Sequence, residues 1–370
     1  MIDFETQKLQ MIALLKKLVE IESPSNDKAA VDRVGAAVAD ECRRLGAAVE
    51  MIPNLLTGDH VIARWGSGPG GILLMHHMDT VFPLGTLQRM PFYEKDGKIF
   101  GPGVLDMKGG IVISLAALAA LRETGALTRP VTLLVTSDEE IGSDTSQELI
   151  KQLARDAALV LVMESGLLDG SLKTWRKGVG DFTVTVKGRA AHAGGAHEEG
   201  RNAIEELAHQ ILAIQKMTDY SRGTTLNVGV IRGGTVSNVV PEEAVAEVDF
   251  RVLQPEEAGR ISAAMQALKP VTPDTTVQVK GGLNRPPMPN NELMKATFEK
   301  ARLIAAGLGM QLQAGGSGGG SDGNFVAPLG VPLLDGMGTY GEGLHSEREY
   351  IFARSLPERA ALTATLIQNW

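Results

Sequence analysis

The sequence predicts an α/β protein: a mixed sheet with helices on both faces, into which a smaller ferredoxin-like α+β domain is inserted. Two observations support this fold class. Short apolar runs alternate with helical patterns through the first half, and from about residue 178 the order becomes strand–helix–strand–strand–helix–strand. The chain of 370 residues is long enough for one large domain or two domains of ordinary size.

In the first half, apolar runs bounded by Gly, Pro and Asp are typical of buried strands. They predict strands at 61–65, 72–76, 131–137 and 158–163, and helical patterns predict helices at 109–125 and 146–154. Sheets of this kind bind ligands at the carboxyl ends of their strands. Polar residues that directly follow these strands are therefore the first candidates for a functional site.

The inserted domain is predicted over residues 178–287, between two parts of a larger domain at 1–177 and 288–370. Alternation with period two predicts strands in DFTVTVKG, TTLNVGVIRGG, AVAEVDFRVL and TTVQVKG. Two amphipathic helices separate them, RNAIEELAHQILAIQKM and PEEAGRISAAMQALK. Segment 281–291 is predicted to be a linker, after which a helix resumes the larger domain.

Composition excludes several classes of protein. The net charge of −8 argues against a nucleic-acid partner. No stretch approaches the ~20 apolar residues needed to span a bilayer, and the first residues lack the pattern of a signal peptide. The single cysteine, Cys42, excludes an internal disulfide and a cysteine-based zinc cluster. We therefore expect a cytoplasmic protein that binds neither a membrane nor nucleic acid.

Acids and a histidine follow the predicted strands. Glu139 and Glu140 come after strand 131–137, Glu164 follows 158–163, and His77 follows 72–76. Two adjacent acids at a buried strand end repel each other unless a cation is present, although a solvated loop is an alternative. On an extended segment His77 and Asp79 point to the same side, so Asp79 can accept a hydrogen bond from the imidazole and orient it.

Two further candidates lie in glycine-rich segments. Asp106 lies in GPGVLDMKGG, where capping of the next helix is the alternative, and His345 lies in YGEGLHSEREY. Two histidines with several carboxylates and no cysteine suit zinc, manganese or cobalt at a water-bearing site. A site for two metals requires five residues if one carboxylate bridges both metals and each metal has two further ligands of its own. A water molecule that bridges the two metals would lose its proton near neutral pH. The chain supplies His77, Asp106, Glu140, Glu164 and His345, which leaves Glu139 as a base.

The motifs HMDT, GPGVLDMKGG, SDEEIGS, VMESG, RAAHAGG, VSNVVP, GGGSDG and LHSE occur in this order along residues 77–346. Together they resemble the co-catalytic dinuclear zinc hydrolases. This family includes carboxypeptidase G (glutamate carboxypeptidase), acetylornithine deacetylase, succinyl-diaminopimelate desuccinylase, aminoacylase and tripeptide aminopeptidase. The resemblance covers essentially the whole chain.

The resemblance implies two zinc ions, for which Co²⁺ or Mn²⁺ can substitute. One ion would be held by His77, Asp106 and Glu164, and the other by Asp106, Glu140 and His345. It also implies a cis peptide bond between Asp106 and Met107, Asp79 as the residue that orients His77, and Glu139 as the general acid/base.

For the inserted domain, the resemblance implies a homodimerisation (lid) role beside a zinc-binding catalytic domain. His192 would reach the active site of the partner subunit and stabilise the tetrahedral oxyanion. Asn238 and Arg251 would bind substrate, with Arg251 taking a carboxylate; an outward arginine paired with an acid is the alternative. Gly320 and Ser321, in the glycine-rich stretch 314–324, would line the same pocket, although a surface loop is an alternative there.

The resemblance implies a metal-dependent amide hydrolase. HMDTVFP and LHSEREY are most similar to the carboxypeptidase G type, which removes a C-terminal amino acid, often glutamate, from a peptide or N-acyl amino acid. GGGSDGNF is similar to the deacetylase and desuccinylase branch, so an N-acyl amino acid deacylase is the alternative. A catalytically inactive binding or dimerisation protein on the same scaffold is a second alternative, although every ligand position is filled.

Overall fold

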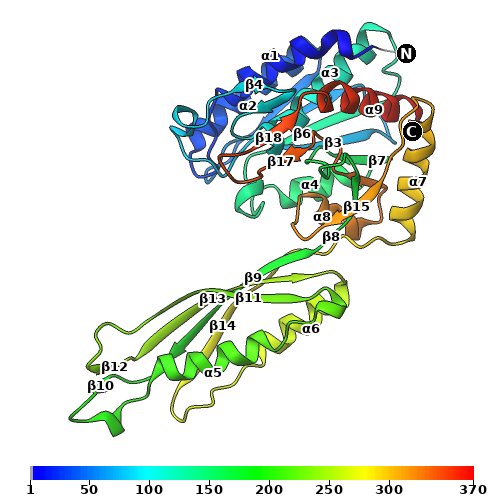
Figure 1. Cartoon of the computed structure of the whole chain (residues 1–370). Coiled ribbons are helices and arrows are strands. Elements are labelled where there is room, and N and C mark those ends of the chain that lie inside the picture. The colour runs from blue at the N-terminus through cyan, green and yellow to red at the C-terminus, as the bar shows by residue number, and fades with distance from the viewer. Residues whose placement is uncertain (1–2) are drawn as a thin grey trace. The chain divides into compact units, whose positions relative to one another are not determined.

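A computed structural model describes residues 3–370, which form two compact units (Figure 1). Unit 1 contains the described residues up to Trp175 together with Asn290–Ser317 and Ser321–Trp370. Unit 2 contains Arg176–Pro289 and Gly318–Gly320.

Unit 1 is built on a mixed eight-stranded sheet, in agreement with the predicted fold class. Its strands, in spatial order, are β1 (Ala48–Ile52), β2 (His60–Trp65), β6 (Val131–Thr136), β3 (Ile72–His77), β7 (Leu159–Val162), β16 (Leu333–Asp335), β8 (Leu172–Arg176) and β15 (Ala314–Ser317). The four central strands β6, β3, β7 and β16 run parallel to one another, whereas β2 and β8 on either side of them are antiparallel. Every residue of β3 is buried, as expected for a parallel strand covered on both faces.

Helices cover this sheet. They are α1 (Lys8–Val19), α2 (Lys28–Arg44), α3 (Gly109–Glu123), α4 (Gln147–Ala154), α7 (Glu292–Ala306), α8 (Gly323–Val326) and α9 (Ser355–Asn369). Leucines of α1, α3 and α9 join Leu74, Leu133 and Leu161 of the central strands in one core. Burial of these side chains is the main force that holds the helices on the sheet.

The helix α3 corrects one expectation from composition. Segment Val104–Glu123 is long and apolar enough to cross a membrane by length and hydropathy, but 83% of its most apolar window is buried within the fold. The reason is packing: α3 contacts α1 and α9 as well as β3, so nearly all of its surface must be apolar.

A second, small sheet in unit 1 was missed by the sequence analysis. It consists of β17 (Gly341–Glu342), β18 (Tyr350–Phe352), β5 (Lys98–Phe100) and β4 (Tyr93–Lys95), in this order. Strands of two or three residues carry almost no periodic signal, and β18 pairs with β5 across most of the chain. This pairing brings the segment around His345 beside the segment around Asp106.

Unit 2 has the predicted ferredoxin-like order of elements. It contains β9 (Gly178–Lys187), α5 (Ala203–Gln215), β11 (Thr225–Gly233), β13 (Glu243–Val252), α6 (Pro255–Gln266) and β14 (Thr276–Arg285). The antiparallel sheet has the order β11–β13–β9–β14, and a two-stranded sheet joins β10 (Ala191–His192) to β12 (Val239–Val240). The predicted linker at 281–291 is wrong in its first part, because β14 continues to Arg285 and pairs with β9 there.

Glu257 of α6 joins three parts of unit 2. Its buried carboxylate accepts hydrogen bonds from Arg222, Thr224 and Arg260 at 2.6–3.0 Å. The hydrogen bond from Arg260 is the largest cause that lowers the pKa of Glu257, to about 2. The ionised form is therefore favoured in the folded protein.

We expect Glu257→Gln to lower the free energy of unfolding of unit 2 at pH 7 by about 1.5–3 kcal/mol, the range for hydrogen bonds to charged groups. Because the pKa is lower in the folded protein, the wild-type advantage is complete above the unfolded pKa near 4.5 and disappears as the pH falls toward 2. Urea unfolding at several pH values measures this difference. A difference that stays constant between pH 7 and pH 3 would contradict the assignment.

Candidate metal centre and active site

The ends of three parallel strands bring the first candidates together. His77 ends β3, Glu139 and Glu140 lie in the turn after β6, and Glu164 follows β7 by two residues. Register places His77 opposite Thr136, so β3 and β6 end at one level. Met75 is opposite Val162, so β7 ends two residues earlier and Glu164, two residues further on, comes near the level of His77. The strand-end argument from sequence therefore describes this edge of the sheet correctly.

Asp106 comes from a different place, the turn between β5 and α3. Its peptide bond to Met107 is cis, as the family resemblance implied. Its Oδ1 lies 3.0 Å from His77 Nε2 and its Oδ2 lies 3.1 Å from His345 Nε2. The two oxygens of one carboxylate thus face two different histidines, which is the arrangement a bridging ligand needs.

Each histidine also meets a second carboxylate. His77 Nε2 lies 3.3 Å from Glu164 Oε1, and His345 Nε2 lies 3.3 Å from Glu140 Oε2. His77, Asp106 and Glu164 are buried, whereas the side chain of His345 is 54% exposed. The structure therefore brings all five predicted ligands into two overlapping groups that share Asp106.

The short distances between these acids and histidines shift their pKa values. Burial, followed by the charge of Asp106, raises the pKa of Glu140 to about 7. Hydrogen bonds to Asp106 and Glu140 raise the pKa of His345 to about 10. Burial opposes a charge on His77, but hydrogen bonds to Asp106, Asp79 and Glu164 raise its pKa well above the usual value. The carboxylates around the two histidines thus raise the pKa of both imidazoles.

The donor set fits metal ions. One oxygen of Glu140, Oε1, is buried and has no hydrogen-bond partner within residues 3–370, which is costly unless a cation binds there. Ligand atoms of His77, Asp106 and Glu140 lie within 4.8 Å of one another. Imidazole and carboxylate donors suit zinc in its water-bearing sites.

Glu139 is half-buried at the same edge. One of its oxygens, with ligand atoms of His77 and Glu164, forms a second group within 4.8 Å. Glu139 therefore lies close enough to the metal ligands to exchange a proton with a water molecule bound there. The same short distance would also allow Glu139 to bind a metal ion itself. Its role as a base remains a prediction from the resemblance.

Asp79 does more than the sequence analysis expected. His77 Nδ1 lies 3.1 Å from the backbone oxygen of Asp79 and 3.4 Å from its Oδ1, so the carbonyl is the nearer acceptor. The Asp79 carboxylate also accepts the backbone N–H groups of Glu139 and Glu140, at 3.3 and 3.2 Å, and the Ser25 hydroxyl at 2.7 Å. Asp79 thus fixes the turn that carries both glutamates as well as the imidazole of His77.

The predicted substrate residues His192 and Asn238 lie together in unit 2. His192 is opposite Val239 in the β10–β12 pair, and Ala193 N–H donates to the Asn238 carbonyl at 2.9 Å. The N–H groups of Gly194 and Gly195 both donate to His192 Nδ1, at 3.1 and 2.9 Å. This fixes the neutral ring as the tautomer with its proton on Nε2, where it can act as a donor.

Arg251 lies at the other end of the same unit. It is near the last residue of β13, whereas Asn238 precedes the first, and the span from Glu243 to Arg251 is about 27 Å at the rise of a strand. Arg251 forms an ion pair with Asp249, with a 2.7 Å contact from Nη2 to Oδ2. The structure therefore separates Arg251 from Asn238 within one chain, and its pairing matches the alternative of an outward arginine beside an acid.

Gly320 lies near Arg251, but Ser321 does not share its surroundings. A Cβ atom on Gly320 would contact Arg285 and Val179, and Val179 is opposite Arg251 and Arg285 in the sheet. Ser321 belongs to unit 1, where its buried hydroxyl donates to Asp335 at 2.7 Å. Its side chain is thus engaged within the fold.

A family model for peptidases matches residues 73–369, and it describes peptidase family M20/M25/M40. The chain belongs to this family. The M20 chain is also 32% identical over 374 residues to Carboxypeptidase G2 of Pseudomonas sp. (strain RS-16), covering 97% of this chain and 89% of that one. These findings confirm the resemblance and support a metallopeptidase or amidohydrolase.

Solved structures of M20-type enzymes share the fold. A tripeptidase from Staphylococcus aureus superposes with a TM-score of 0.79 at 22% identity, over 98% of each chain. The YXEP protein of Bacillus subtilis, described as a dinuclear metal binding peptidase from M20 family, gives 0.70 at 17% identity, again over 98% of each chain. At this identity the likeness concerns the fold alone.

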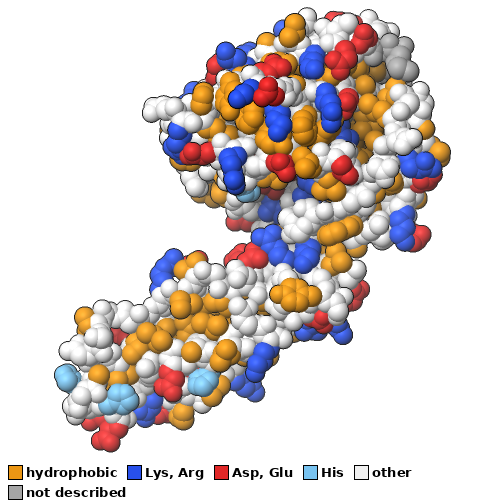
Figure 2. Space-filling model, viewed as in Figure 1, with side chains coloured by type: hydrophobic (Ala, Val, Ile, Leu, Met, Phe, Trp, Pro, Cys, Tyr) orange, Lys and Arg blue, Asp and Glu red, His pale blue; other side chains and the backbone are white. Residues whose placement is uncertain are grey.

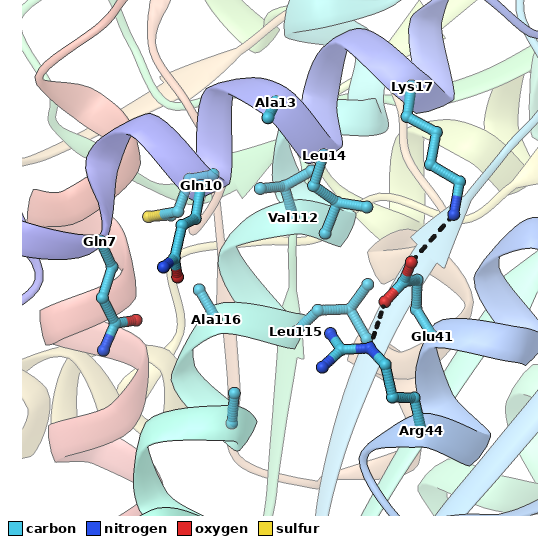
Figure 3. Close-up of a pocket in the computed structure, with 12 residues that line it drawn as sticks. Gln7, Gln10, Ala13, Leu14, Lys17, Glu41, Arg44, Val112, Leu115 and Ala116 are labelled. Atoms are coloured by element: carbon cyan, nitrogen blue, oxygen red, sulfur yellow. Dashed lines mark hydrogen bonds and ion pairs between the residues drawn. The ribbon is translucent and has the colours of Figure 1, made fainter.

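The M20 chain also has a pocket away from the metal ligands. A cavity of about 390 Å³ lies among α1, α2 and α3, where Glu41 pairs with Lys17 and Arg44 (Figure 3). None of the predicted site residues lines it. We therefore assign the chemistry to the edge of the sheet and not to this cavity.

Two residues near the predicted sites were missed from sequence. Arg285 is buried beside Gly320 in unit 2, and Glu349 is buried behind Asp106 in unit 1. Glu349 lies in LHSEREY, four residues after His345, but an acid in a charged run gives no sequence signal for burial. Burial, followed by the charge of Asp106, raises the pKa of Glu349 to about 8, although three backbone N–H groups donate to it and favour its ionised form.

A matched pair of substitutions separates a base from a ligand. We expect Glu139→Ala to keep two metal ions while kcat falls by a factor of about 10²–10⁴, the usual contribution of a general base. Glu140→Ala should lose one metal ion. Metal content by mass spectrometry and kcat on the same samples check both results. Loss of metal from the Glu139 variant and its retention in the Glu140 variant would reverse the two roles.

Proposed function

We propose that this M20 protein is a dinuclear zinc amide hydrolase of the carboxypeptidase G type. It would release a C-terminal amino acid such as glutamate from a peptide or N-acyl amino acid. The observation that carries the proposal is the position of Asp106, with one oxygen toward His77 and the other toward His345. Similarity to Carboxypeptidase G2 supports the finer assignment.

Two Zn²⁺ ions would occupy the overlapping groups, with Co²⁺ or Mn²⁺ as substitutes. His77, Asp106 and Glu164 would hold one ion, and Asp106, Glu140 and His345 the other. Metal ions at such a site polarise the substrate carbonyl and lower the pKa of bound water.

The protein's own residues would then move the proton and hold the substrate. Glu139 takes a proton from the attacking water and returns it to the leaving amine. His192 donates from Nε2 to the oxyanion, and the two N–H groups that donate to its Nδ1 support that tautomer. Asn238, Gly320 and Ser321 are proposed to contact the substrate, Ser321 through its backbone.

An acidic amino acid as leaving group is supported by positive charge around Arg251. Arg251 and Arg285 are both opposite Val179 in the sheet. Burial is the largest cause that lowers the pKa of Lys177, and the charge of Arg251 is the next, so these three cations lie close together. Asp249 neutralises only part of this charge. Arginine binds carboxylates through two parallel hydrogen bonds, so Arg251 is proposed to exchange Asp249 for the substrate carboxylate.

The protein is proposed to act as a homodimer through unit 2. One chain cannot bring Asn238 and Arg251 to one small substrate, because β13 separates them. The strand β11 is at the edge of its sheet, and its Val230 and Ile231 are exposed. Figure 2 shows hydrophobic side chains gathered on the visible face of this unit. An exposed apolar edge strand of this kind is suited to pairing with a second copy.

A substrate panel tests the specificity. We expect the zinc-loaded enzyme to hydrolyse N-acyl and dipeptide substrates that end in Glu or Asp faster than those that end in Lys, because Arg251 and its neighbours attract acids. Arg251→Ala should reduce this preference. Liquid chromatography measures the released amino acid. If Glu and Asp substrates are left intact while N-acetylornithine or N-succinyl-diaminopimelate is cleaved, the enzyme is a deacylase.

Heterodimers test whether the site is shared between subunits. His192→Ala alone should lower kcat by about 10²–10³, as for other oxyanion donors. A heterodimer of His192→Ala and Arg251→Ala chains, purified through two tags, should recover about half of the wild-type activity, because one of its two sites is then complete. Heterodimers as inactive as either variant would mean that His192 acts within its own chain.

A further inference from the structure

Glu349 is fully buried and lies outside the predicted ligand set. Its carboxylate accepts hydrogen bonds from three backbone N–H groups of one turn. Oε1 accepts from Leu105 at 2.7 Å and from Asp106 at 3.1 Å, while Oε2 accepts from Gly103 at 3.2 Å. Both oxygens of this side chain are therefore used to hold backbone.

The turn that Glu349 holds is the one that presents Asp106. Gly103 has a left-handed φ of 74°, and a Cβ atom there would lie 2.9 Å from Thr80 Cγ2, so the turn has little free space. Between β5 and α3 the backbone is irregular, because Asp106 and Met107 have non-helical φ and ψ values within the short helical segment Val104–Lys108. Buried N–H groups without partners are costly, and here one side chain satisfies three of them.

Glu349 also belongs to the segment that carries His345. Glu349 N–H donates to the Ser346 carbonyl at 3.1 Å, and Tyr350, the next residue, pairs with Phe100 at the end of β5. The residue thus links two segments whose metal-facing side chains, Asp106 and His345, are 239 positions apart in sequence.

We propose that Glu349 is a positioning residue for the metal centre. By holding the N–H groups of Leu105 and Asp106, it fixes the Asp106 side chain so that its two oxygens face His77 and His345. This inference rests on the proposed ligand roles of Asp106 and His345. Residues that orient ligands in this way typically change metal affinity by about 10–100-fold when they are lost.

Two variants of Glu349 remove different numbers of its hydrogen bonds and should therefore weaken metal binding to different extents. Glu349→Gln keeps the shape of the side chain, but its NH₂ group must face at least one backbone N–H, so at least one hydrogen bond is lost. Glu349→Ala removes all three. We expect affinity for Co²⁺ to fall by about 10–100-fold in the alanine variant and by less in the glutamine variant. Titration of the metal-free protein, followed by Co²⁺ absorption bands, measures both affinity and ligand geometry.

Glu206 provides a matched control in unit 2. It is also a fully buried glutamate that accepts backbone N–H groups, those of Val271 and Thr272. Glu206→Ala and Glu206→Gln should lower the melting temperature but leave Co²⁺ affinity and the Co²⁺ spectrum unchanged. The Glu349 variants should change both the Co²⁺ affinity and the Co²⁺ spectrum, at temperatures where circular dichroism shows that these variants are folded.

The outcomes are distinct. If the Glu349 variants lower the melting temperature as the Glu206 variants do, with unchanged Co²⁺ affinity and spectrum, then Glu349 only stabilises the fold and the inference is wrong. If the Glu349→Ala variant does not fold, the Co²⁺ affinity and spectrum of the Glu349→Gln variant distinguish the two roles in the same way. If the wild-type protein does not bind two metal ions, or Asp106→Ala still binds both, the proposed function fails instead.

Discussion

Repulsion among acids at one edge of the sheet is the constraint on which the site depends. Asp106, Glu140 and Glu164 meet two histidines at 3.0–3.3 Å. At 4 Å, two like charges near a protein surface cost about 4 kcal/mol, and burial raises this cost. The fold can hold such a cluster only when cations lie within it. Metal ions bound by these side chains would meet this need.

Acids that do not face the proposed metal positions provide much of the rigidity of this edge. Asp79 holds the backbone of Glu139 and Glu140, and Glu349 holds the backbone of Asp106. Asp322, from the glycine-rich stretch, accepts the hydroxyl groups of Thr136 and Ser143 on either side of the Glu139–Glu140 turn. The Glu139–Glu140 turn and the Asp106 turn are thus each fixed by another buried carboxylate.

The candidate substrate-binding residues of unit 2 lie at two opposite ends of a long antiparallel sheet. His192 and Asn238 lie at the end that carries β10 and β12, where Figure 2 shows histidine side chains, and Arg251 and Arg285 lie at the other. The separation follows from the length of β13 and does not depend on side-chain rotamers. A second copy of the chain is the simplest way to bring both ends to one substrate, which is why assembly and catalysis are linked in the proposed function.

The sequence by itself determined the fold class and the strand-end residues His77, Glu139, Glu140 and Glu164, because strand periodicity is local and parallel strands end at one edge. It also singled out Asp106 and His345 from their glycine-rich segments and donor chemistry, and the family resemblance divided the five ligands between two metals. Only the tertiary structure decided that Asp106 bridges the two histidines, that Glu349 holds its turn, and that Asn238 lies far from Arg251. These facts depend on the pairing of β18 with β5 and on strand length and register, which are long-range contacts that local sequence patterns do not encode.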